Sequence, residues 1–285
     1  IMEPKMKAIS AFITMLIIVQ SAFTQYYYQD IIATRQVAEK WNAYKDHKVK
    51  TVYIFSFESD EKPTEGFSCN QNVRSDYSEI STHTKSELAR ESTFTTYYNA
   101  NGQPIKTYDT SKAYQSITEY AFDASGNISS ITNSSLETIN NIKNTEQHFW
   151  RYGADGKLSA MIKVKNGNDT TYVRFIFDEK GNLAEERAVH NKIEAPAVFY
   201  YYDENRQLTD IVRYNPKARR LLPDYIFTYG INGQLSSMLF VPEGSTEYNK
   251  WVYEYNESGL RIKETCYSKQ KEMLGKIEYE YSFNK

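Results

Sequence analysis

A short phrase recurs seven times between Tyr98 and Ile262 and constrains the fold more than any other feature of this chain. It consists of an aromatic residue, four further residues of which the last is almost always glycine, and then a polar and an aliphatic residue. The fifth places are occupied by Gly102, Gly126, Gly156, Gly181, Arg206, Gly233 and Gly259, at steps of 24, 30, 25, 25, 27 and 26 residues. Such narrow spacing predicts a structural repeat.

The residues around each phrase predict a β-hairpin. Trp251, Tyr253 and Tyr255 share one parity while Lys250 and Glu254 take the other, which is the alternation of a half-buried antiparallel strand. The tetrad 178–181, with Asp first and Gly last, is typical of a type I turn closed by a left-handed glycine.

The fifth place of one hairpin departs from this pattern. A non-glycine residue such as Arg206 in the left-handed region costs about 1 kcal/mol unless Asn205 takes that conformation instead. We expect this hairpin to be slightly irregular.

The fold class predicted from these features is all-β. Tandem antiparallel β-hairpin repeats are expected over residues 92–285, forming an extended or curled sheet, with a small N-terminal cap segment at residues 25–91. Within the cap, residues 31–44 have the spacing of an amphipathic helix, residues 51–57 read as a strand, and the polar stretch 68–91 is either edge strands or a loop.

Residues 1–24 are predicted to be a signal peptide. Lys5 and Lys7 precede an apolar run of 12 residues, 8–19, which is shorter than the roughly 20 that a membrane-spanning helix needs. Cleavage after Ala22 and cleavage after Thr24 both fit. We therefore expect a periplasmic, cell-surface or secreted protein with no stable transmembrane anchor.

Composition narrows the range of partners. With 34 basic and 36 acidic residues the net charge is −2, so nucleic acid is not expected as a partner. The 25 Tyr and 14 Phe favour pleated, half-buried strands. The two thiols, Cys69 and Cys266, could form a disulfide in an oxidising compartment or remain as two buried apolar residues, and the sequence weighs these equally.

The phrase resembles the YD repeat of the RHS family, and the segments that carry the resemblance are 175–183, 200–205 and 253–259. The resemblance covers roughly residues 92–285 and implies an extracellular or envelope protein built of hairpins, similar to small secreted Bacteroidetes repeat proteins. The steps here are longer than the family's usual twenty or so residues, and Asp follows the aromatic residue only at Asp123, Asp178 and Asp203. The chain is also too short for a closed toxin cocoon and has no RHS core, so toxin activity is not carried over.

No catalytic or cofactor-binding motif is present in the sequence. The four histidines, at positions 47, 83, 148 and 190, lack metal-site spacing, so a zinc site is not expected and each is interpreted as a surface or half-buried residue. Asp155, Asp178 and Asp203 resemble an acidic array, but turn hydrogen bonding explains them. We predict no cofactor, no metal and no catalytic residue.

The one aromatic excess is the run 198–202, in which both parities are apolar and Phe199 and Tyr201 fall on the face that should be polar. A second layer covering this strand explains the excess without function. The functional interpretation is an exposed platform formed by Phe199 and Tyr201 that binds a glycan or an envelope protein. Trp150 and Trp251 keep the inward parity and are predicted to be core.

Three functions follow for the whole chain. The favoured one is an exported non-catalytic repeat protein of the cell envelope that binds or scaffolds. The alternatives are a carbohydrate-active hydrolase with a carboxylate pair assembled across the sheet and a purely structural envelope protein.

Overall fold

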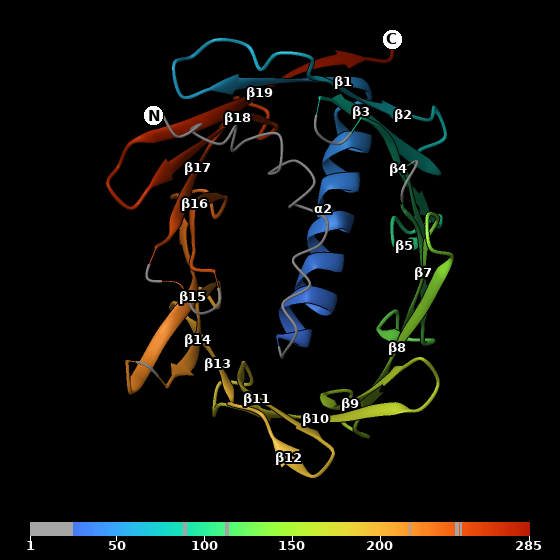
Figure 1. Ribbon diagram of the computed structural model, residues 1–285, viewed down its shortest axis with the longest axis vertical. Coiled ribbons are helices and arrows are strands. Elements are labelled where there is room, and N and C mark those ends of the chain that lie inside the picture. Colours follow the sequence, from blue (N-terminus) through green and yellow to red (C-terminus); the bar gives the residue numbers. More distant parts are fainter. Residues whose placement is uncertain (1–24, 88–89, 112–113, 217, 243–244, 246) are drawn as a thin grey trace.

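The wall of the molecule is a single antiparallel sheet that closes on itself around the N-terminal helix (Figure 1). This computed structural model describes residues 25–87, 90–111, 114–216, 218–242, 245 and 247–285. The predicted signal peptide, residues 1–24, lies outside the described residues.

The described part of the chain begins with a helical segment and continues as strands. A π-helical turn, η1 (Tyr27–Ile32), runs directly into the helix α2 (Ala33–Asp46). The strands that follow are β1 (Val49–Glu58), β2 (Ser68–Val73), β3 (Glu79–Ser86), β4 (Arg90–Tyr98), β5 (Pro104–Ser111), β6 (Tyr114–Phe122), β7 (Ile128–Glu137), β8 (Ile142–Tyr152), β9 (Leu158–Lys165), β10 (Asp169–Phe177), β11 (Leu183–His190), β12 (Ile193–Glu194), β13 (Val198–Tyr202), β14 (Leu208–Asn215), β15 (Arg220–Tyr229), β16 (Leu235–Phe240), β17 (Asn249–Tyr255), β18 (Arg261–Ser268) and β19 (Met273–Phe283).

Closure of the sheet comes from the pairing of β1 with β19, in addition to its pairing with β2. The short β12 pairs with β11, and β11 also pairs directly with β13, so the ring is continuous. The prediction of an all-β antiparallel fold is confirmed, but the prediction of an extended or curled sheet is wrong, because the sheet is a closed barrel. Closure removes the edge strands whose unpaired backbone groups would otherwise face solvent.

The predicted N-terminal cap contributes to both the wall and the interior of this barrel. The predicted helix is α2, and it lies inside the ring instead of covering an end of a sheet (Figure 1). The predicted strand 51–57 is part of β1, and the stretch predicted as edge strands or loop forms β2 and β3, which are paired on both sides. The change in sequence pattern at residue 91 therefore does not divide the sheet.

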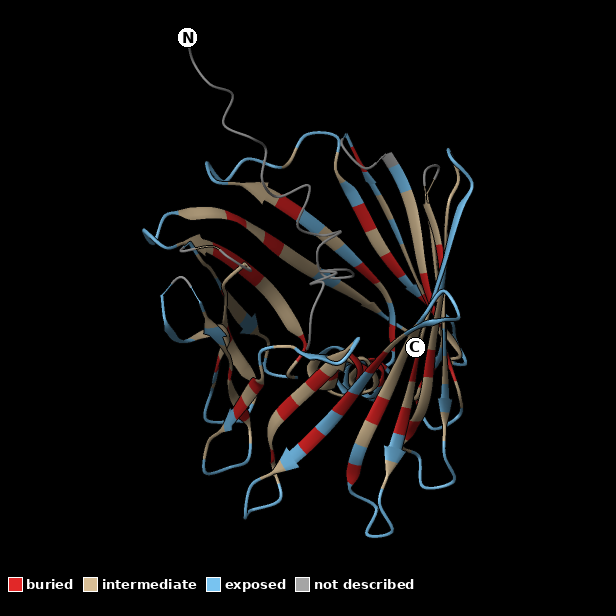
Figure 2. Cartoon of the chain, turned by 60° about the horizontal axis from the view of Figure 1, so that its bottom comes forward, coloured by how far each residue is buried: buried red, intermediate tan, exposed pale blue. Residues whose placement is uncertain are grey.

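The aromatic and aliphatic stripes of the strands face inward onto the helical segment. On β10, Val173 and Phe175 are buried, while Tyr172 and Arg174, which alternate with them along the strand, are exposed on the outer face. Figure 2 shows the same alternation of buried and less buried bands around the barrel. Trp150 and Trp251 are buried, which confirms their predicted core positions.

This interior contains one small cluster, formed by Trp251, Cys266 and Ile277, and two larger ones. The larger surrounds the start of the helical segment and includes Tyr26, Trp150, Met161, Tyr200 and Ile211. The second surrounds the end of α2 and includes Trp41, Tyr44, Val52, Ile80 and Tyr98. Burial of this apolar surface, at about 25 cal/mol per Å², is what fixes the helix inside the sheet.

The repeat turns have the predicted conformation. The six glycines at the fifth place all have φ between +74° and +82°. Arg206 has φ +62°, and its backbone N–H donates to the Asp203 carbonyl at 3.1 Å, as the glycines do in their own turns. The prediction that this hairpin is irregular is wrong, because Arg206 itself adopts the left-handed conformation and the turn keeps its hydrogen bonds.

Two side chains of the phrase join several of the repeats to their neighbours. Gln207 Nε2, in the place after the fifth, donates to the carbonyl of Gly233 in the next turn at 2.8 Å, and Gln103 and Gln234 make the equivalent bond. The first-place Tyr229 hydroxyl donates to the Leu208 carbonyl at 2.8 Å, and Tyr152 and Tyr255 do the same one repeat away. These bonds explain why tyrosine and glutamine recur at these places.

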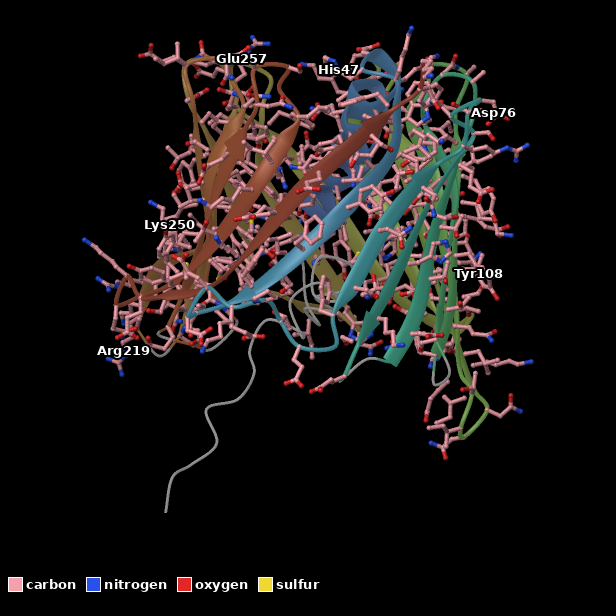
Figure 3. The ribbon with its side chains drawn as sticks, turned by 90° about the horizontal axis from the view of Figure 1, so that it is seen from above. His47, Asp76, Tyr108, Arg219, Lys250 and Glu257 are labelled. Carbon is pink, nitrogen blue, oxygen red and sulfur yellow. The ribbon has the colours of Figure 1, made fainter. Side chains whose placement is uncertain are left out.

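The repeat turns gather at one rim of the barrel, together with the end of α2. Glu257, in the last repeat turn, and His47, which follows α2, lie at this rim in Figure 3, and Arg219 lies at the opposite rim. The Trp41 ring packs against this rim so closely that a Cβ on Gly102 would lie 2.3 Å from it. The helix therefore lies nearer the rim of repeat turns.

Cys69 and Cys266 are both free and buried. The Cys69 sulfur lies 3.4 Å from the Thr84 hydroxyl. Of the two interpretations left open by the sequence, the structure has the one with two buried thiols.

Candidate functional site

The outer face of β13 carries both residues predicted as a binding platform. Val198 and Tyr200 point inward and are buried, so Phe199 and Tyr201 point outward. Tyr201 is 47% exposed, and Phe199 is half-buried. The alternative that a second layer covers this strand is wrong for the described residues, because the barrel wall is a single sheet whose outer face is left open.

These two aromatic side chains line a depression of about 500 Å³. Its other walls come from the turn between β10 and β11 and from the neighbouring repeat turn. The lining residues are Asp178, Glu179, Lys180, Asn182, Ala184, Phe199, Tyr200, Tyr201, Tyr202 and Asp203. Aromatic rings and hydrogen-bonding groups thus border one volume, and that volume is within the usual range for small-ligand sites.

The carboxylates of this depression are held by their own turns. Asp178 accepts from the Asn182 backbone N–H at 2.8 Å and from its side-chain amide at 3.0 Å. The backbone hydrogen bond from Asn182 holds the pKa of the Asp178 carboxyl below its usual value. Asp203 accepts from the backbone N–H groups of Asn205 and Gln207 at 2.9 and 2.8 Å. The interpretation of these aspartates as turn residues is confirmed.

A second depression, of about 390 Å³, lies on β4, β5 and β6. It is lined by Tyr97, Ile105, Lys106, Tyr108 and Ile117, and Figure 3 shows Tyr108 on the outside of the barrel. Lys106 is its one charged lining residue. This surface can pack against apolar groups but has fewer groups to orient a polar ligand.

The interior holds a charged network between the helical segment and the wall. His148 Nδ1 contacts Asp30 Oδ2 at 2.6 Å and its Nε2 contacts Glu146 Oε1 at 3.1 Å. Lys163 Nζ lies 3.0 Å from Glu146, and the Trp150 indole N–H donates to Asp30 at 3.2 Å. The network ties the start of the helical segment to β8 and β9.

Burial and charge act in opposite directions on this network. Burial alone would lower the pKa of His148, but the Asp30 and Glu146 carboxylates outweigh it and raise the pKa to about 9. Burial raises the pKa of Glu146, and hydrogen bonds from His148 and Lys163 outweigh it and bring the pKa to about 2. The expectation that His148 is a surface or half-buried residue is wrong, since it is buried and paired with two carboxylates.

A second buried carboxylate, Glu186, receives the start of the helical segment. It is fully buried and accepts hydrogen bonds from the backbone N–H groups of Gln25, Tyr26 and Tyr27, at 2.8, 3.1 and 3.0 Å. The Tyr200 hydroxyl donates to it at 3.0 Å. Burial raises the pKa of Glu186 above its ordinary value, against the effect of these hydrogen bonds.

The sequence analysis did not single out Glu186 or the third buried carboxylate, Glu264, and it gave His148 no role. A signal for the two glutamates is visible when the repeats are aligned on their left-handed residues. The fifth residue after that position is apolar in four copies, of which Ile131, Met161 and Ile211 are buried and Met238 is partly buried against the same cluster. In two other copies it is Glu186 and Glu264, which places a carboxylate where the fold requires a buried side chain.

Among the described residues, no group of three or more His, Cys, Asp or Glu side chains is placed to hold a metal ion. No helix in the described part of the chain combines the length and the apolar character needed to cross a membrane.

Comparison with known proteins gives no family. No family model matches the chain, and no curated protein matches it. Among solved structures, a porin-like protein from Bacteroides uniformis aligns with 82% of this chain and 98% of its own, at 10% identity and a TM-score of 0.40. A porin-like protein from Bacteroides vulgatus covers 83% and 98%, at 12% identity and a TM-score of 0.29.

A Tc holotoxin pore chain from Photorhabdus luminescens aligns over 76% of this chain and 16% of its own, at 9% identity and a TM-score of 0.30. We draw no argument about function from likenesses at this level. The YD-repeat resemblance therefore stays a prediction from the sequence.

Proposed function

We propose that this is an exported, non-catalytic protein of the cell envelope that binds a glycan in the depression formed by Phe199, Tyr201 and the 178–182 turn. The signal-peptide pattern of residues 1–24 supports export. The observation that carries binding is the pair of outward aromatic side chains within a depression that is bordered by carboxylate, amide and ammonium groups.

The chemistry of the lining fits a sugar better than a flat protein partner. A pyranose ring has an apolar face of C–H groups that packs on an aromatic ring, and hydroxyl groups at its edge that need hydrogen-bonding partners. Phe199 and Tyr201 offer the first, and Asn182, Glu179 and Lys180 offer the second. A protein interface of ordinary size would extend well beyond a depression of this volume.

The electrostatics of Asp178 do not suit this carboxyl to be the proton donor of a glycosidase. A glycosidase needs one carboxylic acid that stays protonated near neutral pH, which requires a raised pKa. The pKa of Asp178 is instead held below its usual value by hydrogen bonds within its turn. Asp178 therefore has the electrostatics of a fixed acceptor.

The test replaces both outward aromatic residues, Phe199→Ser with Tyr201→Ser, and measures binding to a glycan array followed by titration with the best glycan. We expect affinity to fall at least about 10-fold, since aromatic contacts of this kind are each worth on the order of 1 kcal/mol or more. The melting temperature should change little, because both side chains lie on the outer face of the barrel and neither is buried in its core.

A matched control is Tyr53→Ser with Phe55→Ser, which removes the same two side-chain types from β1, where both are exposed. The control should bind as the parent does. Equal loss in both double variants, or full binding by the β13 variant, would contradict the proposed site. An array on which the protein binds no glycan would contradict the proposed ligand.

A further inference from the structure

Gln25 occupies a buried site in which its backbone nitrogen and its side-chain amide each contact a carboxylate. It is 2% exposed, its backbone nitrogen lies 2.8 Å from Glu186 Oε1, and its side-chain amide donates to Asp224 Oδ2 at 2.6 Å. Its carbonyl accepts the backbone N–H of Gln29 at 2.9 Å, which begins the helical segment. Both ends of this residue are therefore fixed.

The two carboxylates that contact Gln25, those of Asp224 and Glu186, differ in their partners. Asp224 is paired with the Arg213 guanidinium at 2.5 Å, so that carboxylate has a cation within reach. The four described hydrogen-bond donors to Glu186, namely three backbone N–H groups and the Tyr200 hydroxyl, are uncharged. A fully buried carboxylate with only neutral donors is costly, because burial penalises the charged form.

The backbone of Gln25 gives a second, independent indication. Its φ is +112°, a region that L-residues other than glycine rarely adopt. This torsion is defined by the carbonyl carbon of the preceding residue. In a chain that starts at Gln25 there is no such atom, and the strain does not exist.

We infer that signal-peptide cleavage after Thr24 creates the mature N-terminus at Gln25, and that its α-ammonium group forms a buried ion pair with Glu186. This inference rests on the export proposed above and chooses between the two cleavage points that the sequence left open. Cleavage would then also stabilise the fold, because the uncleaved precursor has no α-ammonium group at Gln25 to pair with Glu186.

The first test is N-terminal sequencing and intact-mass measurement of the exported protein. We expect Gln25 as the first residue, with a free amine. A chain that begins at Phe23 would overturn the inference, and so would cyclisation of Gln25, in which the α-amine attacks the side-chain amide carbon and ammonia leaves, because either outcome removes the ammonium from this site. A protein that keeps residues 6–24 in a membrane fraction would instead contradict the proposed export.

The second test compares melting temperatures of a chain that starts at Gln25 and a chain that starts three residues earlier, at Ala22, each with and without Glu186→Gln. Starting at Gln25 should raise the melting temperature by about 5 to 10 °C, the size expected for a buried ion pair in a domain of this length. Glu186→Gln should lower the melting temperature of the chain that starts at Gln25. In the longer chain it should leave the temperature unchanged or raise it.

Glu264→Gln is the control, because Glu264 occupies the same repeat position and has its own cation in Arg261. It should cause the same shift in both chains. If Glu186→Gln also causes the same shift in both chains, no ammonium is paired with Glu186 and the inference is wrong.

Discussion

Glu186 and Glu264 occupy the same position of two different repeats, five residues after Gly181 and Gly259. The two buried carboxylates nevertheless have different partners. Glu264 is 3% exposed and pairs with the Arg261 guanidinium at 2.8 Å, while the Tyr279 hydroxyl donates to it at 2.7 Å. Glu186 is fully buried and receives the start of the helical segment.

At Glu264 the barrel holds a carboxylate at a core position of the repeat together with a cation. For Glu264 that cation comes from the same strand, three residues earlier. For Glu186 we infer that it comes from the N-terminus of the processed chain. Variants of the barrel test this difference between the two glutamates and the packing around them, and we take them in order of decreasing expected effect.

The largest effect is expected for Arg261→Met. Nearby carboxylate and tyrosine groups raise the pKa of Arg261 despite its burial, so it is a fixed cation. Its removal leaves the buried Glu264 with the Tyr279 hydroxyl but without a charged partner, and should cost about 3 to 5 kcal/mol in unfolding free energy. The double variant with Glu264→Gln should recover most of this loss in urea unfolding. A double variant that is no more stable than Arg261→Met would show that the charge pair is not the cause.

The next effect compares two repeat glycines. A Cβ on Gly102 would lie 2.3 Å from a Trp41 ring carbon, whereas a Cβ on Gly181 meets nothing within 4 Å. Gly181→Ala should cost about 1 kcal/mol, for the left-handed backbone alone. Gly102→Ala should cost about 3 kcal/mol, because overpacking against the helix adds to that term. Equal losses in thermal or urea melts would mean that Trp41 does not pack on this turn.

The charged network at His148 predicts a pH dependence. Its pKa is about 9 in the folded protein and about 6.5 when unfolded, so the stabilisation is complete below about pH 6.5 and is lost as the pH rises through 9. The difference in unfolding free energy between the parent and His148→Gln should therefore be largest near pH 6, on the order of 1 to 3 kcal/mol, and should shrink by pH 9.5. A difference that is constant over this range would contradict the pairing with Asp30 and Glu146.

The smallest effect is expected for Arg206→Gly. Arg206 is the one non-glycine residue at the fifth place and has φ +62°. Glycine removes the left-handed penalty but adds flexibility to the unfolded chain, so the net gain should be up to about 1 kcal/mol. The melting temperature should rise slightly, and a clear fall would mean that the arginine side chain contributes something that the turn geometry does not require.

Local rules predicted the repeat well because its parts act over short distances. The turn chemistry of the 178–181 tetrad, the alternation around Trp251 and the helix within residues 31–44 each depend on residues close in sequence. Closure of the sheet could not be predicted in this way, because the pairing of Val52 with Tyr281 depends on the twist summed over all the strands between them. The position of the helix inside the ring follows only from closure.

The candidate site was predicted in part. The excess of apolar residues at Phe199 and Tyr201 indicated an unusual strand, but the sequence could not decide between a covering layer and an open face. That depends on whether the sheet folds back on itself or closes as one layer. The role of Gln25 and Glu186 could not be predicted from a single copy of the repeat, because it depends on a contact across 161 positions of the chain.

The most direct measurement of the contrast between the two glutamates is a crystal structure of the exported protein. We expect electron density that begins at Gln25, with its free amino nitrogen within about 3 Å of a Glu186 carboxylate oxygen, the distance of a charge-assisted hydrogen bond. Continuous density for residue 24 attached to that nitrogen would contradict it.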